Sequence, residues 1–463
     1  MRSETTGRVR LGAAIALLAL LVAGVCARPA PAAASDASTK AGIVRILTRN
    51  GVAGSRTGVY VWDIDTGQQV YGRNSATPLA PASNLKLLTS ATALLDWGPD
   101  HRFITGLYGP GGPSPNGTIY GDLYLRGYGD PSLSTLQYQR QVMHIKTSSF
   151  EAFAQKLRKL GVRKVRGGVI GDEGWFDTRR TGPDWKPGIQ VECGPLSALS
   201  GNEGLDDGNR VADPAKWSAK LLVRALKAAG IKVTGKAGAG TVPVADTLLA
   251  TQRSAPLSTI LKRMNKDSDN FFAEMLLKGL GKDFTGSGTS DAGVGVVRVT
   301  LKTIGLPLQS VVMHDGSGLS YDDRVTAAFL VQLLTTMTRR PEAGAYYQSL
   351  AIAGEDGTLR ERMRGTAAQG NAHAKTGTLD IAVSLSGYVL SANKRSVGYS
   401  ILVNGGEVNW TRATKAQDAI TVLLANASLP GTPLQSPAAL AWHHQVLVSE
   451  AVDSGGGFLQ PQL

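Results

Sequence analysis

Residues 81–98 read PASNLKLLTSATALLDWG, a long apolar run that contains a single lysine. Ser83 suits a helix N-terminus and good helix formers follow it, so we expect a helix that begins near Ser83 and runs to about Leu95. Its apolar residues cover nearly the whole helix surface, so the helix and Lys86 should be buried. Burial without an acidic partner lowers the pKa of a lysine, which makes Lys86 a candidate base for the Ser83 hydroxyl. The alternative is that Lys86 extends to water and that Ser83 only caps the helix.

The chain has 463 residues, enough for two or more domains. Arginines, an apolar run from Leu11 to about Ala27 and then small residues are typical of a secretory signal peptide, which we place at residues 1–34. The run is close to the shortest membrane span, so an uncleaved anchor is the alternative. We therefore expect an exported, extracytoplasmic protein of the cell wall or periplasm, or a secreted one. After such cleavage Cys193 is the only cysteine, which excludes an internal disulfide.

The formal net charge is +13, which favours anionic surroundings such as a cell envelope. A nucleic-acid binder is an alternative, but aromatic residues are scarce and the sequence has neither a basic helix nor a zinc pattern, so we expect no nucleic-acid partner. No second apolar run is long enough to span a bilayer, which predicts at most peripheral membrane association. HExxH, CxxC and GxxxxGK motifs do not occur, and we expect neither a metal nor a cofactor.

The order of the patterns predicts a mixed α+β fold, in which a sheet is flanked by helices and interrupted by a large insertion. A spacer to about Thr39 precedes an alternating segment, residues 57–79, that reads as a hairpin around a DTG turn. Strand patterns return in HAKTGTL (373–379), AVSLSGYVL (382–390) and VGYSILVNG (397–405), and helical patterns in PLSTILKRM (256–264), FFAEMLLKGLG (271–281) and VTAAFLVQLLTTMTRR (325–340). Thr326 is the expected cap of the last helix. Turn-rich, strand-like and mixed pieces fill the interval from about 98 to 250.

Two further triplets accompany Ser83 and Lys86. Ser268-Asp269-Asn270 stands between two helical patterns, and Lys375-Thr376-Gly377, the only KTG in the chain, opens a strand pattern. A serine with a lysine three residues later is weak evidence alone, since Ser391 and Lys394 have the same spacing in a turn. The ordered set of three elements, each in a suitable structural setting, is distinctive.

This set resembles that of the penicillin-recognising serine hydrolases, whose shared elements are SxxK, SxN and KTG. MNKDSDNFFAEMLLK (264–278), HDGSGLSYDDRVTA (314–327), GEDGTLRERM (354–363) and AKTGTLDIAVSLSGYV (374–389) are similar to stretches of the D-alanyl-D-alanine carboxypeptidases and endopeptidases among the class C low-molecular-mass penicillin-binding proteins. The resemblance covers roughly residues 58–425. It implies the penicillin-binding-protein and β-lactamase-like transpeptidase fold, an antiparallel sheet flanked by helices.

The resemblance also implies a domain division, because this family carries a long insertion between its first two motifs. We expect a discontinuous catalytic domain over residues 35–98 and 252–430, an inserted non-catalytic region of one or two subdomains at 99–251, and a C-terminal tail at 431–463.

Acyl transfer through a covalent serine intermediate is the chemistry implied by the family. Ser83 would attack the carbonyl between two D-alanines, with Lys86 as its base. Ser268 would relay the proton to the leaving amine, and Asn270 would hydrogen-bond the substrate backbone. The structural alternative for Ser268 and Asn270 is capping of a helix that starts at Phe271.

The KTG strand would bind the end of the substrate. By resemblance, Lys375 supplies positive charge, Thr376 and Thr378 hydrogen-bond the terminal carboxylate, and Gly377 lets the substrate approach the strand. The backbone N–H groups of Ser83 and Thr378 would form the oxyanion hole.

The implied partners are peptidoglycan peptides that end in D-Ala-D-Ala, with β-lactam antibiotics as covalent inhibitors. The balance of carboxypeptidase and endopeptidase action and the oligomeric state stay open. A β-lactamase and a catalytically silent wall-binding protein are the alternatives. Residues 315–318 and 356–358 match family stretches, but a turn explains them equally well, so we leave them out of the catalytic set. We expect His373 to be structural and Cys193 to be inert.

Overall fold

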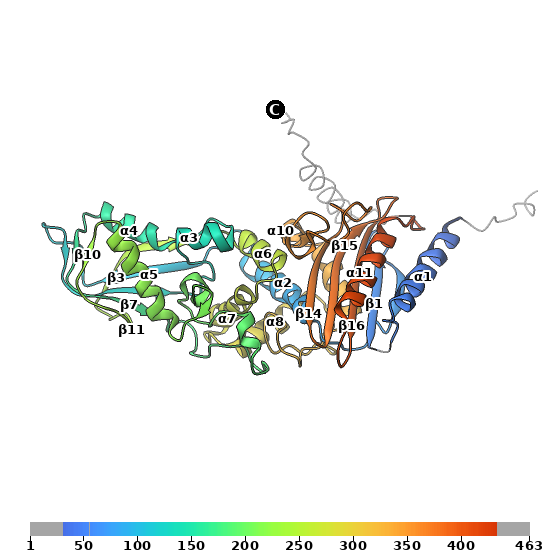
Figure 1. Cartoon of the computed structure of the whole chain (residues 1–463), viewed down its shortest axis with the longest axis horizontal. Helices are drawn as coiled ribbons and strands as arrows, with labels where there is room; N and C mark the ends of the chain where they lie inside the picture. The colour runs from blue at the N-terminus through green and yellow to red at the C-terminus, as the bar shows by residue number, and fades with distance from the viewer. Residues whose placement is uncertain (1–30, 55, 433–463) are drawn as a thin grey trace, which may run out of the picture.

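One sheet combines strands from residues 57–73 with strands from residues 351–404. The computed structural model describes residues 31–54 and 56–432, and its six-stranded sheet has the order β13-β14-β15-β16-β1-β2, with every neighbouring pair antiparallel (Figure 1). The strands are β1 (Thr57–Asp63), β2 (Gln68–Arg73), β13 (Ala351–Ile352), β14 (His373–Leu379), β15 (Ala382–Leu390) and β16 (Ser396–Asn404). Because β1 pairs with β16 along its whole length, the early hairpin and the last strand fold as one unit. This antiparallel sheet with flanking helices confirms the predicted fold class.

Helices cover both faces of the sheet, which explains why side chains on both faces of β15 and β16 are buried. On one face lie α1 (Pro31–Arg49) and α11 (Trp410–Ala425), and on the other lies α9 (Ala327–Met337). The expected spacer to about Thr39 is wrong, because α1 already begins at Pro31 and Thr39 is buried. Further along α1, Ile43 and Leu47 are completely buried in the cluster that also holds strand and α11 residues. Thr326 caps α9 as predicted, since its hydroxyl accepts a hydrogen bond from the Phe329 amide at 3.0 Å.

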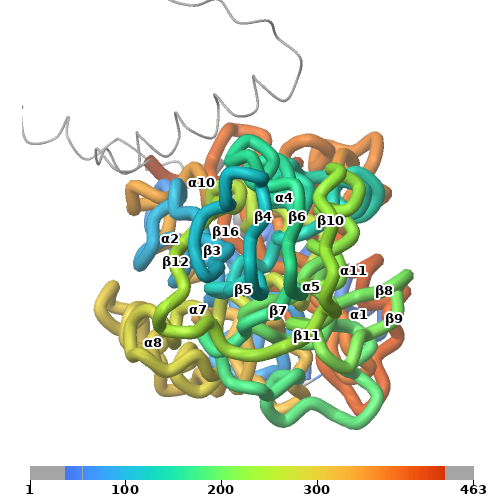
Figure 2. The backbone as a smooth tube through the Cα atoms, turned by 90° about the vertical axis from the view of Figure 1, so that its left-hand side faces the viewer, coloured from blue at the N-terminus to red at the C-terminus, as the bar shows by residue number. Residues whose placement is uncertain are grey.

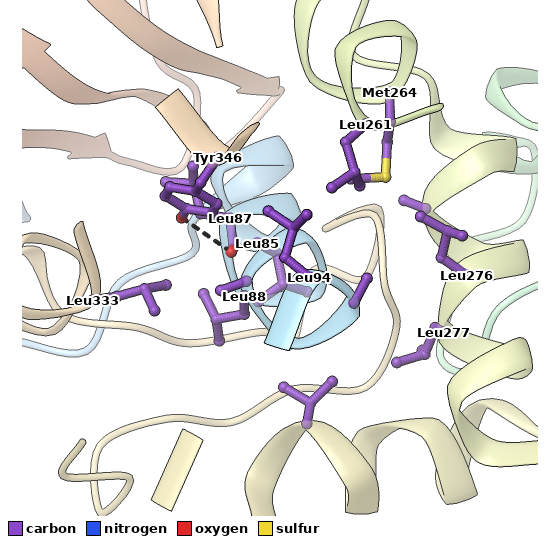
Figure 3. Packing of buried hydrophobic residues seen from close by; sticks show 14 of the residues in the cluster. Leu85, Leu87, Leu88, Leu94, Leu261, Met264, Leu276, Leu277, Leu333 and Tyr346 are labelled. Carbon is purple, nitrogen blue, oxygen red and sulfur yellow. Dashed lines mark hydrogen bonds between the residues drawn. The ribbon is translucent and has the colours of Figure 1, made fainter. Parts of the chain in front are cut away.

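The helix that the sequence predicts near Ser83 begins slightly later. A 3₁₀ turn spans Ala82–Leu85 and α2 spans Lys86–Trp97, and neither has a side-chain cap, so the capping role considered for Ser83 is wrong. Leucines of α2 project into the core in every direction (Figure 3). Tyr346 fixes the helix further, because its hydroxyl donates to the Leu87 carbonyl at 3.1 Å.

Helices surround α2 in the middle of the molecule. They are α6 (Leu257–Lys266), α7 (Asn270–Thr285), α8 (Ser290–Thr303) and α10 (Ala343–Gln348), and the short turn Gly357–Leu359 lies beside them. The helices predicted at 256–264 and 271–281 correspond to α6 and α7. Their buried residues share one hydrophobic cluster with α2, so the helical layer is continuous from the sheet to the insertion.

The insertion has its own sheets and its own hydrophobic cluster. A five-stranded sheet has the order β11-β7-β5-β3-β12 and a three-stranded sheet the order β10-β6-β4, and Figure 2 views them from the end of the molecule. The strands are β3 (Ile104–Gly109), β4 (Thr118–Ile119), β5 (Leu123–Gly127), β6 (Lys164–Val165), β7 (Val169–Asp172), β10 (Lys232–Val233), β11 (Ala237–Ala239) and β12 (Thr247–Arg253), with β8 (Leu205–Asp206) and β9 (Asn209–Arg210) as a separate pair. The helices are α3 (Leu136–Tyr138), α4 (Phe150–Lys159) and α5 (Pro214–Ala228), with short turns at Gln139–Met143, Ile189–Glu192 and Gly201–Gly204. Helices α4 and α5 were not predicted, since this interval was expected to hold turn-rich, strand-like and mixed pieces.

Most of the predicted signal peptide and of the C-terminal tail lies outside the described residues. Within residues 31–54 and 56–432, no helix combines the length and the apolar character that crossing a membrane requires.

We predict that Leu88→Ala destabilises the protein by about 2–5 kcal/mol, because Leu88 is completely buried in α2 and its truncation leaves a cavity. The matched control is Val299→Ala on α8, whose side chain is 66% exposed and whose loss should change the free energy of unfolding by less than about 0.5 kcal/mol. Urea unfolding followed by circular dichroism measures both. Equal effects of the two substitutions would contradict the central role of α2.

Candidate active site

Ser83 and Lys86 meet where the 3₁₀ turn passes into α2. The Lys86 ammonium lies 2.9 Å from the Ser83 hydroxyl oxygen, since residues three apart share a helix face. Ser83 is partly exposed and lines a cavity, whereas Lys86 is completely buried. Ala82, directly before Ser83, has a φ of +47°, a left-handed conformation that costs a non-glycine residue free energy. The serine thus stands at a strained turn, with the Lys86 amine behind it.

Lys86 has three hydrogen-bond acceptors and none of them is a carboxylate. Besides Ser83, its ammonium donates to the Asn270 side-chain oxygen at 2.6 Å and to the Ser317 carbonyl at 2.8 Å. Burial lowers the pKa of Lys86 to about 8, against the opposing effect of the Asp315 and Glu274 carboxylates. A neutral Lys86 keeps two donors for Asn270 and Ser317, and its lone pair can then accept the Ser83 proton.

The start of α7 carries Ser268 and Asn270, and both line the same cavity as Ser83. Asp269 between them caps the helix, since its carboxylate accepts from the Phe272 amide at 3.1 Å and pairs with Arg263 at 3.2 Å. The capping role considered for Ser268 and Asn270 is therefore wrong. Ser268 has a φ of +61°, a second strained residue at the cavity.

Strand β14 runs directly beside the Ser83 turn. A β-carbon on Gly377 would lie 2.8 Å from the Ser83 amide nitrogen and 2.9 Å from the Pro81 carbonyl, so only glycine permits this approach. The Asn84 side-chain amide donates to the Lys375 carbonyl at 3.0 Å, and the Ser384 hydroxyl donates to the Pro81 carbonyl at 2.6 Å. These bonds hold the turn against β14 and β15.

The KTG side chains take different positions on β14. Thr376 and Thr378 line the cavity, and the Thr376 hydroxyl donates to that of Thr358 at 2.8 Å. Lys375 is completely buried and its ammonium donates to the Thr376 carbonyl at 3.0 Å. Burial, followed by repulsion from Lys86, holds the pKa of Lys375 well below its usual range. Lys375 therefore lies behind the cavity wall and not on it.

The loop at Asp315–Gly318, which we left out of the catalytic set, supplies one of the three acceptors of Lys86. Buried Glu274 accepts from the Gly316 and Ser317 amides at 2.9 and 2.8 Å, which fixes the Ser317 carbonyl. Burial, with repulsion from Asp315, raises the pKa of Glu274 to about 8. Gly316, Ser317 and Gly318 are ordinary turn residues, so nothing in their identity predicts that a backbone carbonyl accepts from Lys86 here.

Asp315 connects this loop to the insertion. Its carboxylate accepts from the Gly318 and Ser320 amides, both at 2.7 Å, and from the Trp185 indole at 2.8 Å. From the same insertion segment, the Glu192 carbonyl accepts from the Asn270 side-chain amide at 2.8 Å.

The cavity has a volume of about 630 Å³ and is shared by both parts of the chain. Its lining includes Ser83, Ser268, Asn270, Tyr321, Thr358, Thr376, Gly377, Thr378 and Trp410, and residues 186–189, 191 and 192 of the insertion. The insertion residues, Tyr321 and Trp410 are not among the predicted site residues, and Thr358 lies in the 356–358 segment that a turn explained equally well. Trp410 reaches the cavity from the first residue of α11. His373 is buried and stacked on Tyr347 at 4.0 Å between ring centroids, and burial lowers its pKa to about 3, in keeping with a structural role. Cys193 is buried and unpaired, and burial raises its pKa.

Comparison with known proteins identifies relatives along almost the whole chain. The D-Ala-D-Ala carboxypeptidase 3 (S13) family profile matches residues 40–205 and 198–427. A D-alanyl-D-alanine carboxypeptidase of Actinomadura sp. strain R39 is 34% identical over 92% of this chain and 92% of its own length. The crystal structure of penicillin-binding protein 4 from Haemophilus influenzae superposes with a TM-score of 0.67 at 21% identity, covering 88% of this chain and 98% of that one. The same protein complexed with a β-lactam gives 0.63 at 22% identity, with coverages of 81% and 98%.

We predict that the second-order rate of Ser83 acylation by a penicillin rises with pH to a midpoint near 8, where Lys86 loses its proton. Below that midpoint the ammonium form dominates and cannot accept the serine proton, so the rate should fall about tenfold per pH unit. Stopped-flow measurement with a chromogenic β-lactam between pH 5.5 and 9.5 gives the profile.

Two variants serve as controls for this profile. Lys86→Arg, which stays charged at every pH tested, should abolish acylation. Lys394→Met, at the exposed lysine of the other serine–lysine pair, should keep the midpoint. A rate that is flat or decreasing across this range would exclude Lys86 as the base.

Proposed function

The chain belongs to the D-Ala-D-Ala carboxypeptidase 3 (S13) family and is a serine-type D-Ala-D-Ala peptidase, and we propose that it works through an acyl-enzyme on Ser83. The observation that carries this proposal is the contact between a buried, carboxylate-free Lys86 and the Ser83 hydroxyl at the cavity. No cofactor is needed, since base, nucleophile and oxyanion donors all come from the chain.

In the first step Lys86 takes the Ser83 proton while the serine oxygen attacks the carbonyl between the two D-alanines. The resulting oxyanion accepts from the backbone N–H groups of Ser83 and Thr378. The close approach of Gly377 to the Ser83 amide supports this assignment, because it brings Thr378 beside Ser83.

The oxyanion then collapses, the carbon–nitrogen bond breaks and the leaving amine takes a proton through Ser268. Water hydrolyses the ester and restores Ser83. Asn270 orients Lys86, because its side-chain oxygen accepts from the lysine and its side-chain amide is held by the Glu192 carbonyl. Asn270 also hydrogen-bonds the substrate backbone.

The KTG strand recognises the carboxylate end of the substrate. Thr378 donates a hydrogen bond to it from the cavity wall, and Thr376 does so when its hydroxyl turns away from Thr358. Lys375, whose charged form burial disfavours in the free enzyme, takes up a proton behind the wall when this anion binds. Repulsion from Lys86 contributes to the low pKa of Lys375, since two buried cations repel each other.

The substrates in this proposal are peptidoglycan stem peptides that end in D-Ala-D-Ala, and β-lactams are covalent inhibitors that acylate Ser83 and leave slowly. Carboxypeptidase and endopeptidase action share the acyl step and differ only in the leaving amine. The protein works outside the cytoplasm, where peptidoglycan lies. Residues 35–98 with 252–430 form the catalytic domain and 99–251 the insertion, a division that the separate hydrophobic cluster of the insertion supports.

We expect a fluorescent penicillin to label the mature protein one-to-one and to leave Ser83→Ala unlabelled, because the serine oxygen forms the ester. Denaturing gels and intact mass measure the adduct. Ser391→Ala is the matched control, since Ser391 also precedes a lysine by three residues but lies in a turn, and it should label like the wild type. Penicillin consumed without a persistent adduct would indicate a β-lactamase. Intact penicillin and no adduct would indicate a catalytically silent wall-binding protein.

A further inference from the structure

A second cavity, of about 400 Å³, lies in the insertion and has a different character. It is lined by His101, Arg102, Phe103, Ile104, Gly106, Tyr108, Tyr128, Trp175, Leu248, Thr251 and Asp283. Aromatic rings form much of its wall, and two aliphatic side chains at its edge, Ile104 and Leu248, are strongly exposed. The catalytic mechanism uses none of these residues.

The cavity lies on the face of the five-stranded sheet that α4 and α5 leave open. Along β3, Leu107 belongs to the hydrophobic cluster under these helices, so Gly106 and Tyr108 must face the opposite way. Residues of β12 and of the loops after β5 and β7 complete the wall on that side, and Asp283 comes from the end of α7. Figure 1 shows α4 and α5 together in the insertion, to the left of α7.

The aromatic rings are held in place before any ligand arrives. A β-carbon on Gly106 would lie 2.6 Å from the Tyr108 ring, so the glycine leaves room for that ring to lie over the strand. The hydroxyls of Tyr108 and Tyr128 are hydrogen-bonded at 2.7 Å, and the Tyr128 ring meets Trp175 edge to face at 5.0 Å between centroids. The result is a fixed aromatic surface with hydroxyl groups at its edge.

Cations surround this surface. The Lys282 ammonium lies 4.7 Å from the Trp175 ring centroid, and the Arg126 guanidinium carbon lies 5.3 Å from that of Tyr128. Arg102 is exposed at the wall itself. Asp283 on the wall and Asp172, 3.7 Å from Arg126, offset part of this charge. The cations stay in excess, which attracts an anionic polymer, in line with the net charge of +13.

We propose that this cavity binds N-acetylhexosamine units of a peptidoglycan glycan strand. A pyranose ring has C–H faces that pack on aromatic rings and hydroxyl groups around its edge that need polar partners, and the cavity offers both. The carboxylates of the attached stem peptides make the polymer anionic, which matches the cations around the wall. The choice of this glycan rests on the proposed peptidoglycan substrate.

The glycan site is separate from the catalytic cavity. Asn270 begins α7 and Asp283 lies near its end, so the two cavities are about 20 Å apart along the helix at 1.5 Å per residue. Binding at the second cavity would hold the enzyme on the polymer without touching the scissile bond. It would lower KM for peptidoglycan and leave small peptide substrates unaffected.

The first test is calorimetric titration of the full-length protein with N-acetylglucosamine tetramer. We expect a dissociation constant of about 1 mM or tighter, weakened about tenfold in Trp175→Ala, which corresponds to about 1.4 kcal/mol. Leu248→Glu should weaken binding similarly and should fold, since this side chain is 53% exposed. The matched control is Tyr120→Ala, a 57% exposed aromatic elsewhere in the insertion, which should bind like the wild type.

The second test compares turnover of insoluble peptidoglycan with that of an acyl-D-Ala-D-Ala peptide. Trp175→Ala and Leu248→Glu should raise KM for the polymer about fivefold or more and leave kcat/KM for the peptide within twofold. Failure of wild type to bind the tetramer, or equal losses on both substrates, would overturn the proposal. A concentration-dependent dimer that Leu248→Glu abolishes, without tetramer binding, would assign the surface to a second copy instead. Penicillin labelling of Ser83 in every variant separates these outcomes from failure of the catalytic proposal.

Discussion

The site depends on one constraint: a lysine is held away from water by neutral hydrogen-bond acceptors. An ion pair would keep Lys86 protonated, whereas Ser83, Asn270 and Ser317 stabilise it without fixing its charge. The fall of its pKa from 10.5 to about 8 corresponds to about 3 kcal/mol against the charged form. That destabilisation is what makes an amine useful as a base near neutral pH.

The rest of the catalytic region supports this arrangement. Helix α2 is buried on all sides from Lys86 to Leu94, so Lys86, its first residue, lies inside the core. Gly318 packs so closely on the Ala82 carbonyl that a β-carbon on this glycine would lie 1.9 Å from the carbonyl oxygen. A β-carbon on Gly377 would lie 2.8 Å from the Ser83 amide nitrogen. The backbone at Gly318 and the backbone at Gly377 thus pack against the turn from two sides, which accounts for the persistence of the strained φ at Ala82. The pairing of β1 with β16 closes the sheet behind the turn.

Sequence alone predicted the parts whose chemistry lies in side chains at fixed spacing. Ser83 with Lys86, the SDN triplet and the KTG strand meet at one cavity or directly behind its wall, because each sits at an element end that the apolar periodicity also predicted. The Ser317 carbonyl escaped prediction because every residue carries one, and only the Glu274 contacts select it. A spacer was expected for the first part of α1, to about Thr39, because only tertiary packing makes this segment part of the fold. Helices α4 and α5 were grouped with mixed pieces, although both are amphipathic and begin at the capping residues Ser149 and Asp213.

The insertion does more than extend the chain, because one of its segments contacts the support of Lys86 twice. Trp185 donates to Asp315, which orders the loop that presents the Ser317 carbonyl, and the Glu192 carbonyl holds the amide of Asn270. Two of the three acceptors of Lys86 are thus tied to residues 185–192. A displacement of this segment would alter the hydrogen bonds that Lys86 donates to Asn270 and Ser317, and hence the proton affinity on which the proposed attack by Ser83 depends. The same segment lines the cavity at Ser83, so one part of the insertion contacts both this cavity and the groups that hold Lys86.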